Sequence, residues 1–155
     1  IAKYIPDPFG MKQTKVLLSE NEIIKMAKGY DMEGNETAYW NNKFAEPVGG
    51  IHSTAADMLQ FIKNPISGSD DASNLSHNLT FGDVTAGIGL TWDIYTTKKG
   101  YLRWAHEGGT YGFSSLLMIY PELKSGIILM TNNGDHDDQA FYDIGTAIYL
   151  SLTDK

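Results

Sequence analysis

The chain has 155 residues, of which 42% are hydrophobic and 20% charged, as expected for a single globular domain with its own core. Its net charge of −7 argues against nonspecific binding to nucleic acids or anionic membranes, because phosphates repel an acidic surface. The chain lacks cysteine, which excludes disulfides and thiolate chemistry, and no apolar run approaches the roughly 20 residues that span a bilayer.

The first fifty residues predict one short helix between irregular segments. Residues 1–18 contain two prolines and are expected to follow an extended or turning path. Ser19, with Glu22 three residues later, has the pattern of a capping box, and Gly29 should end the helix that it starts. Residues 31–50 have no hydrophobic period and several turn-forming residues, which predicts a loop.

A clearer helix is predicted after Thr54, which forms an acidic capping box with Asp57. Pro65 should end this helix. The polar residues 66–87 are predicted to form a mobile surface loop, with His77 on the surface. The apolar face of the helix is given by residues at helical spacing: Ala55, Met58, Leu59, Phe61 and Ile62.

From Gly87 onward the hydrophobic period changes to two, which predicts strands. The first strand is marked by apolar residues at alternate positions: Ile88, Leu90, Trp92 and Ile94. After a turn, further strands are expected at 101–106, 113–120 and 126–131. The last two have apolar runs that indicate coverage on both faces.

Residues 135–152 predict a final helix, which Asp135 can cap. Helices followed by an antiparallel meander and a terminal helix packed on the sheet predict an α+β fold. We expect a single incomplete domain, with a helical and loop part at 1–85 and the antiparallel sheet plus C-terminal helix at 86–155. The buried stripe of the final helix is expected to be Phe141, Ile144, Ile148 and Leu152.

The strongest candidate for chemistry is the edge that begins at His106. This residue is expected at the end of a strand, with Gly108 and Gly109 after it. Glycines there let the backbone approach a ligand, and their N–H groups can serve as oxyanion donors. The histidine can hold an anionic group or move a proton. The alternative is an ordinary hairpin turn with a solvated histidine, and spacing alone favours this alternative.

Other reactive-looking clusters favour structural roles. The sequence GDHDDQ, residues 134–139, resembles a metal site around His136, but adjacent residues of a helix do not share a face. Helix capping by its aspartates is the preferred interpretation, and no metal is expected. Ser114 and Ser115 are not candidate nucleophiles, because no base is placed beside them.

Several ring-bearing side chains have expected places. His52 follows a pair of glycines and is expected to be structural or solvated. Trp92 and Trp104 fall on strands and should lie in the core. Trp40 is a candidate for the wall of a cleft. Tyr111 follows the glycines and is expected to project near the site.

Three ordered segments resemble one protein family. The stretch HEGGTYGFSS, with Pro121-Glu122, Gly126 and Asn132 after it, follows the order His-x-Gly, Gly-Phe-x-Ser, Pro-Glu, a Gly-led apolar strand and an Asn. The segments PDPFGMKQT and GGIHSTAADMLQF precede it. Together they resemble the C-terminal part of the serine β-lactamase and penicillin-binding-protein superfamily, in its class C β-lactamase-related branch. That branch includes D-alanyl-D-alanine carboxypeptidases and esterases.

The resemblance implies an acyl-enzyme mechanism on β-lactam, D-alanyl peptide or ester substrates, in which a serine attacks the carbonyl carbon. Gly109 would supply one oxyanion N–H, and His106 would hold the cationic position of the third motif. No cofactor is implied. The remaining substrate contacts would come from Glu107, Gly108, Thr110 and Tyr111.

The nucleophile motif of the family does not occur in these 155 residues, which contain no Ser-x-x-Lys. Tyr39-Trp40-Asn41 imitates a Tyr-x-Asn motif, but it follows the PDPFGM segment instead of preceding it, so Tyr39 is interpreted as a decoy. We therefore expect a fragment that is inactive alone and whose partner is the missing N-terminal half. The strand at 126–131 would then be an exposed edge, which predicts a homodimer.

A non-catalytic module derived from the same fold, which binds peptidoglycan peptides or small molecules, is the alternative function. A stable proteolytic product without a separate role is a third, weaker interpretation. The expected ligand in the first two cases is a small molecule or a peptidoglycan peptide, with no nucleic-acid partner. By resemblance, the protein is expected to be periplasmic, secreted or on the cell surface, although the chain carries no signal for this.

Overall fold

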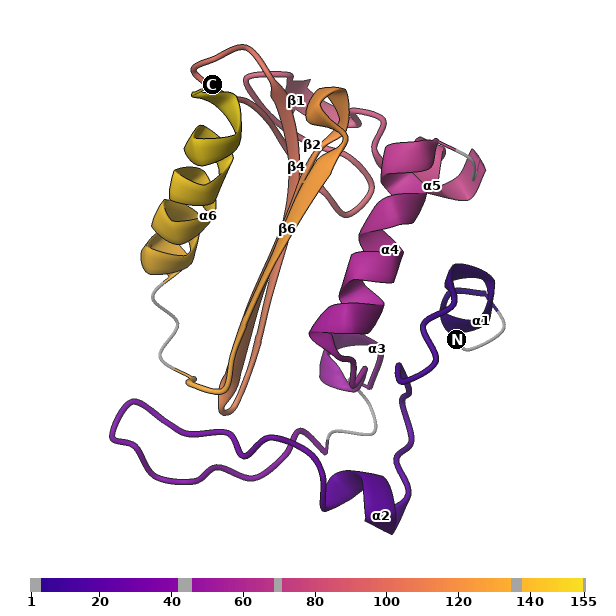
Figure 1. The fold of residues 1–155 in the computed structure, drawn as a ribbon, viewed down its shortest axis with the longest axis vertical. Helices are drawn as coiled ribbons and strands as arrows, with labels where there is room; N and C mark the ends of the chain where they lie inside the picture. Colours follow the sequence, from indigo (N-terminus) through magenta and orange to yellow (C-terminus); the bar gives the residue numbers. More distant parts are fainter. Residues whose placement is uncertain (1–3, 42–45, 69–70, 135–137, 155) are drawn as a thin grey trace.

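A six-stranded antiparallel sheet forms the centre of the molecule, and its strand order follows the sequence from β1 to β6. The computed structural model describes residues 4–41, 46–68, 71–134 and 138–154. Helix α6 covers one face of the sheet and α4 the other (Figure 1), which confirms the predicted α+β fold. The strands are β1 (Phe81–Asp83), β2 (Ala86–Ile88), β3 (Asp93–Thr96), β4 (Leu102–Thr110), β5 (Phe113–Tyr120) and β6 (Ser125–Thr131).

The two helices that cover the sheet are α4 (Ala55–Ser67) and α6 (Asp138–Thr153). None of the helices in the described ranges is long and apolar enough to cross a membrane. The other helical segments are short: α1 (Pro6–Phe9), α2 (Glu20–Ile23), α3 (Glu46–Gly49), α5 (Asp71–Ser76) and the 3-10 helix η1 (Pro121–Leu123).

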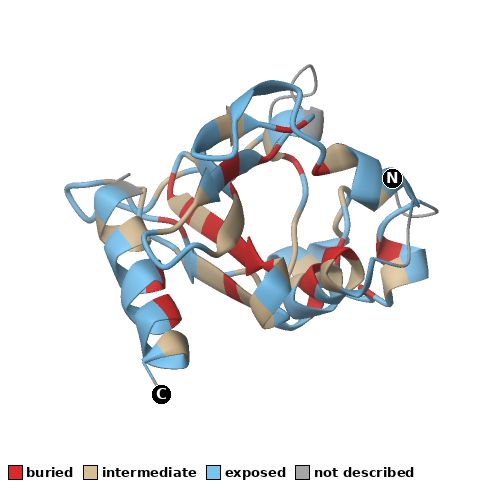
Figure 2. Ribbon diagram, turned by 90° about the horizontal axis from the view of Figure 1, so that it is seen from above, coloured by how far each residue is buried: buried red, intermediate tan, exposed pale blue. Residues whose placement is uncertain are grey.

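Side chains of the long strands alternate between two packed layers, because successive residues of a strand point to opposite faces. The buried residues gather on the strands and on the sheet-facing side of α6 (Figure 2). The layer under α4 contains Ile62 of the helix with Trp92, Leu117 and Ile119. The layer under α6 contains Tyr149 of the helix with Ala105, Leu116, Met118, Tyr120 and Ile127.

Helix α6 turns a different side to the sheet from the one predicted. Gly145 and Tyr149 face the sheet, and a Cβ at Gly145 would lie 2.8 Å from the Met118 sulfur. The glycine therefore lets the helix approach closely, a contact that apolar periodicity does not reveal. The predicted cap, Asp135, lies outside the described residues. Phe141 is half-buried, and the other three residues of the predicted stripe are exposed: Ile144, Ile148 and Leu152.

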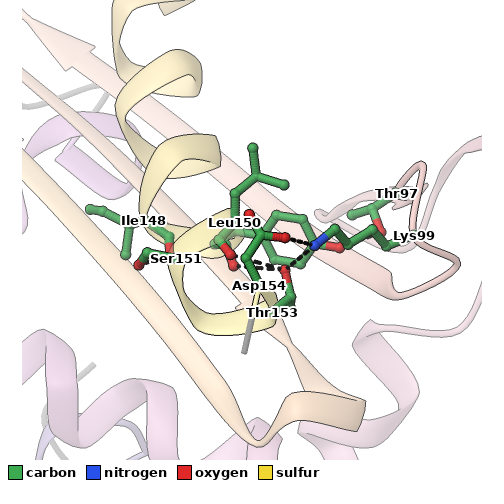
Figure 3. A network of polar contacts seen from close by, with 8 residues as sticks. Thr97, Lys99, Ile148, Leu150, Ser151, Thr153 and Asp154 are labelled. Atoms are coloured by element: carbon green, nitrogen blue, oxygen red, sulfur yellow. Dashed lines mark hydrogen bonds and ion pairs between the residues drawn. The ribbon is translucent and has the colours of Figure 1, made fainter.

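The far end of α6 is fastened to the turn between β3 and β4 (Figure 3). Lys99 pairs with the carboxylate of Asp154 and donates a hydrogen bond to the Thr153 hydroxyl at 3.0 Å. Inside this ion pair, the hydroxyls of Thr97 and Tyr149 are hydrogen-bonded at 2.9 Å. The turn and the helix thus hold each other through one exposed and one half-buried contact.

Helix α4 runs two residues past Pro65, which was predicted to end it. Pro65 lies in the last turn, where its missing N–H removes one hydrogen bond near the helix end, and its ring is buried. Burial of the ring offsets that loss. The helix ends instead at Gly68, whose φ of 64° lies in the left-handed region that a glycine cap favours.

The prediction of a mobile loop at 66–87 was wrong for most of its length, because helix α5 and the β1–β2 hairpin lie there. Polar side chains stabilise the hairpin. The Thr80 hydroxyl donates to the Ile88 and Gly89 carbonyls at 2.9 Å, and Asp83 accepts the N–H of Thr85 at 2.8 Å. Local polar hydrogen bonds of this kind leave no apolar period in the sequence.

The strand predicted across 88–94 is interrupted. β2 ends at Ile88 and β3 begins at Asp93, and the Gly89 N–H donates to the Trp92 carbonyl at 2.8 Å to close the turn between them. A Cβ at Gly89 would lie 2.6 Å from the Ser76 carbonyl, so the chain after α5 passes directly over this position. Trp92 and Ile94 are buried as predicted, but Ile88 and Leu90 are exposed.

Strand β4 is longer than predicted and extends to Thr110. Gly108 and Gly109 pair with Ser115 and Ser114 of β5, so they belong to the ladder and do not form a turn. His106 therefore lies in the middle of the strand and not at its end. The prediction ended the strand too early because glycines usually weaken a strand, whereas here the pairing with β5 holds them in it.

The capping box at Ser19 is confirmed, with both of its hydrogen bonds present. Helix α2 nevertheless ends at Ile23 and not at Gly29, since Ile23 and Ile24 are exposed and no apolar face is buried. Gly29 has another role. A Cβ on it would lie 2.7 Å from the Phe113 ring, so its small size lets this segment pack against the β4–β5 turn.

Candidate active site

The half of β4 that follows Ala105 has an open edge. β3 pairs with β4 as far as Ala105, and no strand in the described ranges lies beside residues 106–110 on that side. The hydrogen-bonding groups of successive residues in a strand point to opposite edges. The Thr97 N–H donates to the Tyr101 carbonyl on the β3 side, so by alternation the N–H of Gly109 faces the open edge.

A groove of about 1070 Å³ opens beside this edge. Gly108, Ser115 and Met130 lie in register on neighbouring strands, on the face of the sheet that carries α4, and they line the groove. Gly49, residues 51–54 and Trp40 also line it. Because Gly109 borders the same groove, its outward amide and the groove form one site.

The buried carboxylate of Asp57 ties two distant segments together at this groove. It accepts the N–H of Gln13 at 2.7 Å and the hydroxyl of Thr14 at 2.8 Å. The Thr14 hydroxyl also lies 2.8 Å from the hydroxyl of Ser53, which lines the groove. The segments PDPFGMKQT and GGIHSTAADMLQF, separated in the sequence, therefore meet beside the sheet.

The structure places three of the predicted catalytic and substrate-contact residues at the groove and one of them on the other face of the sheet. Gly108, Gly109 and Thr110 line the groove. Glu107 has the opposite orientation in the strand and acts on Tyr142 of α6. Burial, followed by the negative charge of Glu107, raises the pKa of Tyr142 to about 12. Glu107 thus lies on the other face of the sheet from the groove.

His106 is exposed and shares its face of the sheet with Gly108. Its ring centroid lies 6.1 Å from that of Trp92, with the two planes 82° apart. Edge-to-face contacts of this kind orient aromatic rings. The imidazole is therefore next to the groove along β4 rather than within its wall.

Aromatic residues surround the β4–β5 turn at the other end of the groove. Tyr111 is 57% exposed, and its ring lies 5.2 Å from that of Trp40. A Cβ at Gly49 would lie 3.0 Å from the Trp40 ring, so the glycine makes room for the indole. Tyr39, interpreted from sequence as a decoy, lines the groove as well and stacks on Phe113 at 6.4 Å.

The prediction that His77 lies on the surface was wrong, since only 7% of it is exposed. Its ring lies 3.9 Å from that of Trp104 and 5.0 Å from that of Trp92. Burial lowers the pKa of His77 to about 4, so the ring is neutral at pH 7. Nothing in the sequence indicated that His77 is buried, because the residues around it are polar. Its ring makes the contact between the end of α5 and the sheet.

The lining of the groove is more basic than the chain as a whole. Lys12 and Lys25 line it, whereas the acidic Glu22 is paired with Lys15 at 2.5 Å, which lowers the pKa of Glu22 to about 2. His52 also lines the groove, and burial lowers its pKa, so it is neutral at pH 7. This balance favours a ligand with an anionic group.

The serines and the acidic cluster to which the sequence assigned structural roles are not placed as reactive groups in the described residues. Ser114 and Ser115 donate hydrogen bonds to the carbonyls of Asn133 and Gly108, each at 3.3 Å. Within the described ranges, no group of three or more histidine and acidic side chains is arranged to hold a metal ion. Asp135, His136 and Asp137 lie outside those ranges.

Comparisons with known proteins agree on one family. The chain is 24% identical over 190 residues to a beta-lactamase of Yersinia enterocolitica, a match that covers 94% of this chain and 48% of that protein. The fold is similar to the crystal structure of a beta-lactamase from Sulfitobacter sp. EE-36, with a TM-score of 0.84, 16% identity, and coverage of 99% of this chain and 52% of that one.

The fold is also similar to the D-alanine carboxypeptidase AmpC from Burkholderia cenocepacia, with a TM-score of 0.74, 18% identity, and coverage of 84% and 48% of the two chains. The chain thus spans about half the length of these relatives. The family model described as Beta-lactamase matches residues 1–148. This chain therefore belongs to the beta-lactamase family, whose fold is that of serine hydrolases.

Proposed function

We propose that this chain supplies the oxyanion edge and part of the substrate groove of a serine hydrolase that acts through an acyl-enzyme. Its substrates would be β-lactams, D-alanyl peptides or small esters. The observation that carries the proposal is the N–H of Gly109, which faces an unpaired strand edge beside the groove. A backbone donor held in a rigid ladder is suited to stabilise negative charge that develops on a carbonyl oxygen.

The other groups at the site support an anionic substrate. Lys12 and Lys25 give the groove a positive lining within an acidic chain. His106 lies next to it along β4, where it would approach the carboxylate of a β-lactam or a D-alanyl peptide. In this proposal Gly109 polarises the carbonyl, and the basic residues orient the substrate.

The nucleophile would come from residues beyond these 155. The sequence holds no Ser-x-x-Lys, and the hydroxyls of Ser114 and Ser115 are hydrogen-bonded to backbone carbonyls. The incoming serine oxygen would attack the substrate carbonyl carbon, while a base outside this chain takes the serine proton. The C–N or C–O bond of the substrate would then break, with the base returning the proton to the leaving nitrogen or oxygen, and water would release the acyl group.

The first test measures the purified 155-residue chain with a chromogenic β-lactam and a nitrophenyl ester. We expect no steady hydrolysis, because covalent catalysis needs the nucleophile. Steady turnover by this chain would show that the nucleophile had been placed wrongly. Saturable binding without turnover, even when the upstream residues are present, would instead favour a non-catalytic module that binds peptidoglycan peptides.

The second test changes Gly109 in a longer protein that includes these residues. Gly109→Pro removes the N–H, and proline is tolerated in an edge strand where that N–H makes no ladder bond. Loss of one oxyanion donor should lower kcat about 100- to 1000-fold. Gly109→Ala keeps the N–H and is the matched control. Equal activity of the proline and alanine variants would contradict the role of this amide.

A location outside the cytoplasm also stays a prediction from the family.

A further inference from the structure

Three hydroxyl and carboxyl groups form a continuous chain from the interior to the groove. Asp57, 7% exposed, accepts the Thr14 hydroxyl at 2.8 Å, and Thr14 is itself 7% exposed. The Thr14 and Ser53 hydroxyl oxygens lie 2.8 Å apart, and half-buried Ser53 lines the groove. The interior end of the chain is fixed further by the Gln13 N–H, which Asp57 also accepts at 2.7 Å.

The direction of each proton in this chain follows from the carboxylate. A carboxylate only accepts hydrogen bonds, so Thr14 must place its single hydroxyl proton toward Asp57. Thr14 then has only lone pairs for Ser53, and the proton between the two hydroxyls must come from Ser53. The other acceptor near Ser53 in the described part of the chain is the Thr54 carbonyl at 3.5 Å, which is beyond the usual range for an O–H donor.

From this geometry we infer that Ser53 is a recognition residue that accepts a hydrogen bond from a donor group of the ligand, such as an amide N–H. Its only proton is committed to Thr14, so the Ser53 oxygen offers the groove lone pairs alone. An ester oxygen or a carboxylate at the same place is itself an acceptor, so its lone pairs would face those of Ser53 and no hydrogen bond would form. Ser53 therefore selects ligands with a hydrogen-bond donor at this position. The identification of that donor as a substrate amide rests on the proposed function.

The chain of hydroxyls gives this preference its rigidity. An isolated surface serine rotates its hydroxyl and both donates and accepts. Here rotation would break the contact to Thr14 and leave a buried oxygen without its donor, which costs more than an exposed hydrogen bond returns. The buried carboxylate of Asp57 thus sets what Ser53 presents to the groove, through the hydroxyl of Thr14 that lies between them.

The experiment uses two small amides that need neither a nucleophile nor a carboxylate, so its result is separate from the proposed function. N-methylacetamide has an N–H, and N,N-dimethylacetamide has none. Both are titrated into the ¹⁵N-labelled 155-residue chain, and the backbone signals of residues 52–54 are followed. We expect N-methylacetamide to move these signals at concentrations about three- to tenfold lower than N,N-dimethylacetamide, as one hydrogen bond predicts. Equal responses, or no response to either amide, would overturn the inference.

Three variants test the proton direction. Thr14→Val removes the acceptor and frees the Ser53 proton, so the preference between the two amides should largely disappear. Thr14→Ser keeps the hydroxyl and should restore it. Ser53→Ala, at a half-buried position, should respond to both amides equally. Ser76→Ala, outside the groove, should behave like the unaltered chain. A preference that survives Ser53→Ala would also overturn the inference, and this variant decides even if Thr14→Val does not fold.

Discussion

The imidazole of His77 lies flat against the indole of Trp104, with the ring centroids 3.9 Å apart and the planes 9° from parallel. Trp92 contacts the same imidazole at 5.0 Å. Neither nitrogen of His77 has a hydrogen-bond partner among the described residues. The contact that holds the end of α5 on the sheet is thus made by a ring that has to stay uncharged.

The burial of His77 predicts a loss of stability in acid. Its pKa falls from 6.5 to about 4 on folding, so below pH 6.5 the unfolded chain binds a proton that the folded chain does not. Stability should fall as the pH drops from 6.5 to 4, by up to about 3 kcal/mol from this residue. Urea unfolding at half-unit steps of pH measures the change.

His77→Phe is the matched variant, because it keeps an aromatic ring and removes the titration. The difference in unfolding free energy between His77→Phe and the unaltered chain should grow as the pH falls from 6.5 to 4. Carboxylates titrate in both proteins and cancel in this difference. A difference that stays constant over the interval would show that His77 is accessible to protons in the folded state.

A second prediction concerns Gly126, at the contact of β6 with α4. A Cβ at this position would lie 2.3 Å from the Ile62 side chain, which is 3% exposed. Gly126→Ala should therefore destabilise the fold by about 1–3 kcal/mol through overpacking. The check is a double-mutant cycle with Ile62→Ala, in which the combined loss is smaller than the sum of the single losses. Additive losses would mean that the two side chains do not meet.

The exposed edge of β6 predicts association. β6 is the last strand of the sheet in the described ranges, and its outer backbone groups can pair with another strand. We expect the 155-residue chain to form a dimer whose population rises with concentration in sedimentation equilibrium. Met130→Lys places a charge on this strand and should weaken the dimer. A monomer at all concentrations would contradict the edge-pairing prediction.

The two contacts that fasten α6 should differ in strength. Tyr149 is 3% exposed and packs on Tyr120 at 4.6 Å, so Tyr149→Ala should cost about 3–5 kcal/mol. The ion pair between Lys99 and Asp154 is at the surface, so Lys99→Ala should cost less than about 1 kcal/mol and even less in high salt. Thermal unfolding in low and high salt separates the two. A larger effect of Lys99→Ala would indicate that the ion pair carries the helix.

Local signals in the sequence predicted the parts of the fold that depend on local interactions. Ser19 and Thr54 cap helices as their patterns indicated, and the strand predicted at 113–120 has the observed bounds. The buried positions Trp92 and Ile94 were also predicted from their alternation. Each of these depends on residues within a few positions of one another, which is what periodicity and capping rules describe.

The errors arose where contacts between distant segments decide the outcome. The side that α6 presents to the sheet depends on the fit of Gly145 against Met118, and no apolar period records that fit. His77 is buried because two tryptophans from later segments cover it. At the site, the sequence identified the glycines after His106. It did not show that Glu107 points to the opposite face of the sheet, because this depends on β4 continuing past His106.

The meander order of the sheet has a consequence for how the molecule forms. Every pair of hydrogen-bonded strands is joined by a short connection, so closing each hairpin costs little chain entropy. The β4–β5 hairpin, with a two-residue turn, can form first, and the neighbouring strands can then pair with it on either side. Tyr149 of α6 packs against residues of β4, β5 and β6, so we expect the helix to dock after these strands have paired, when the open edge of β4 has already formed.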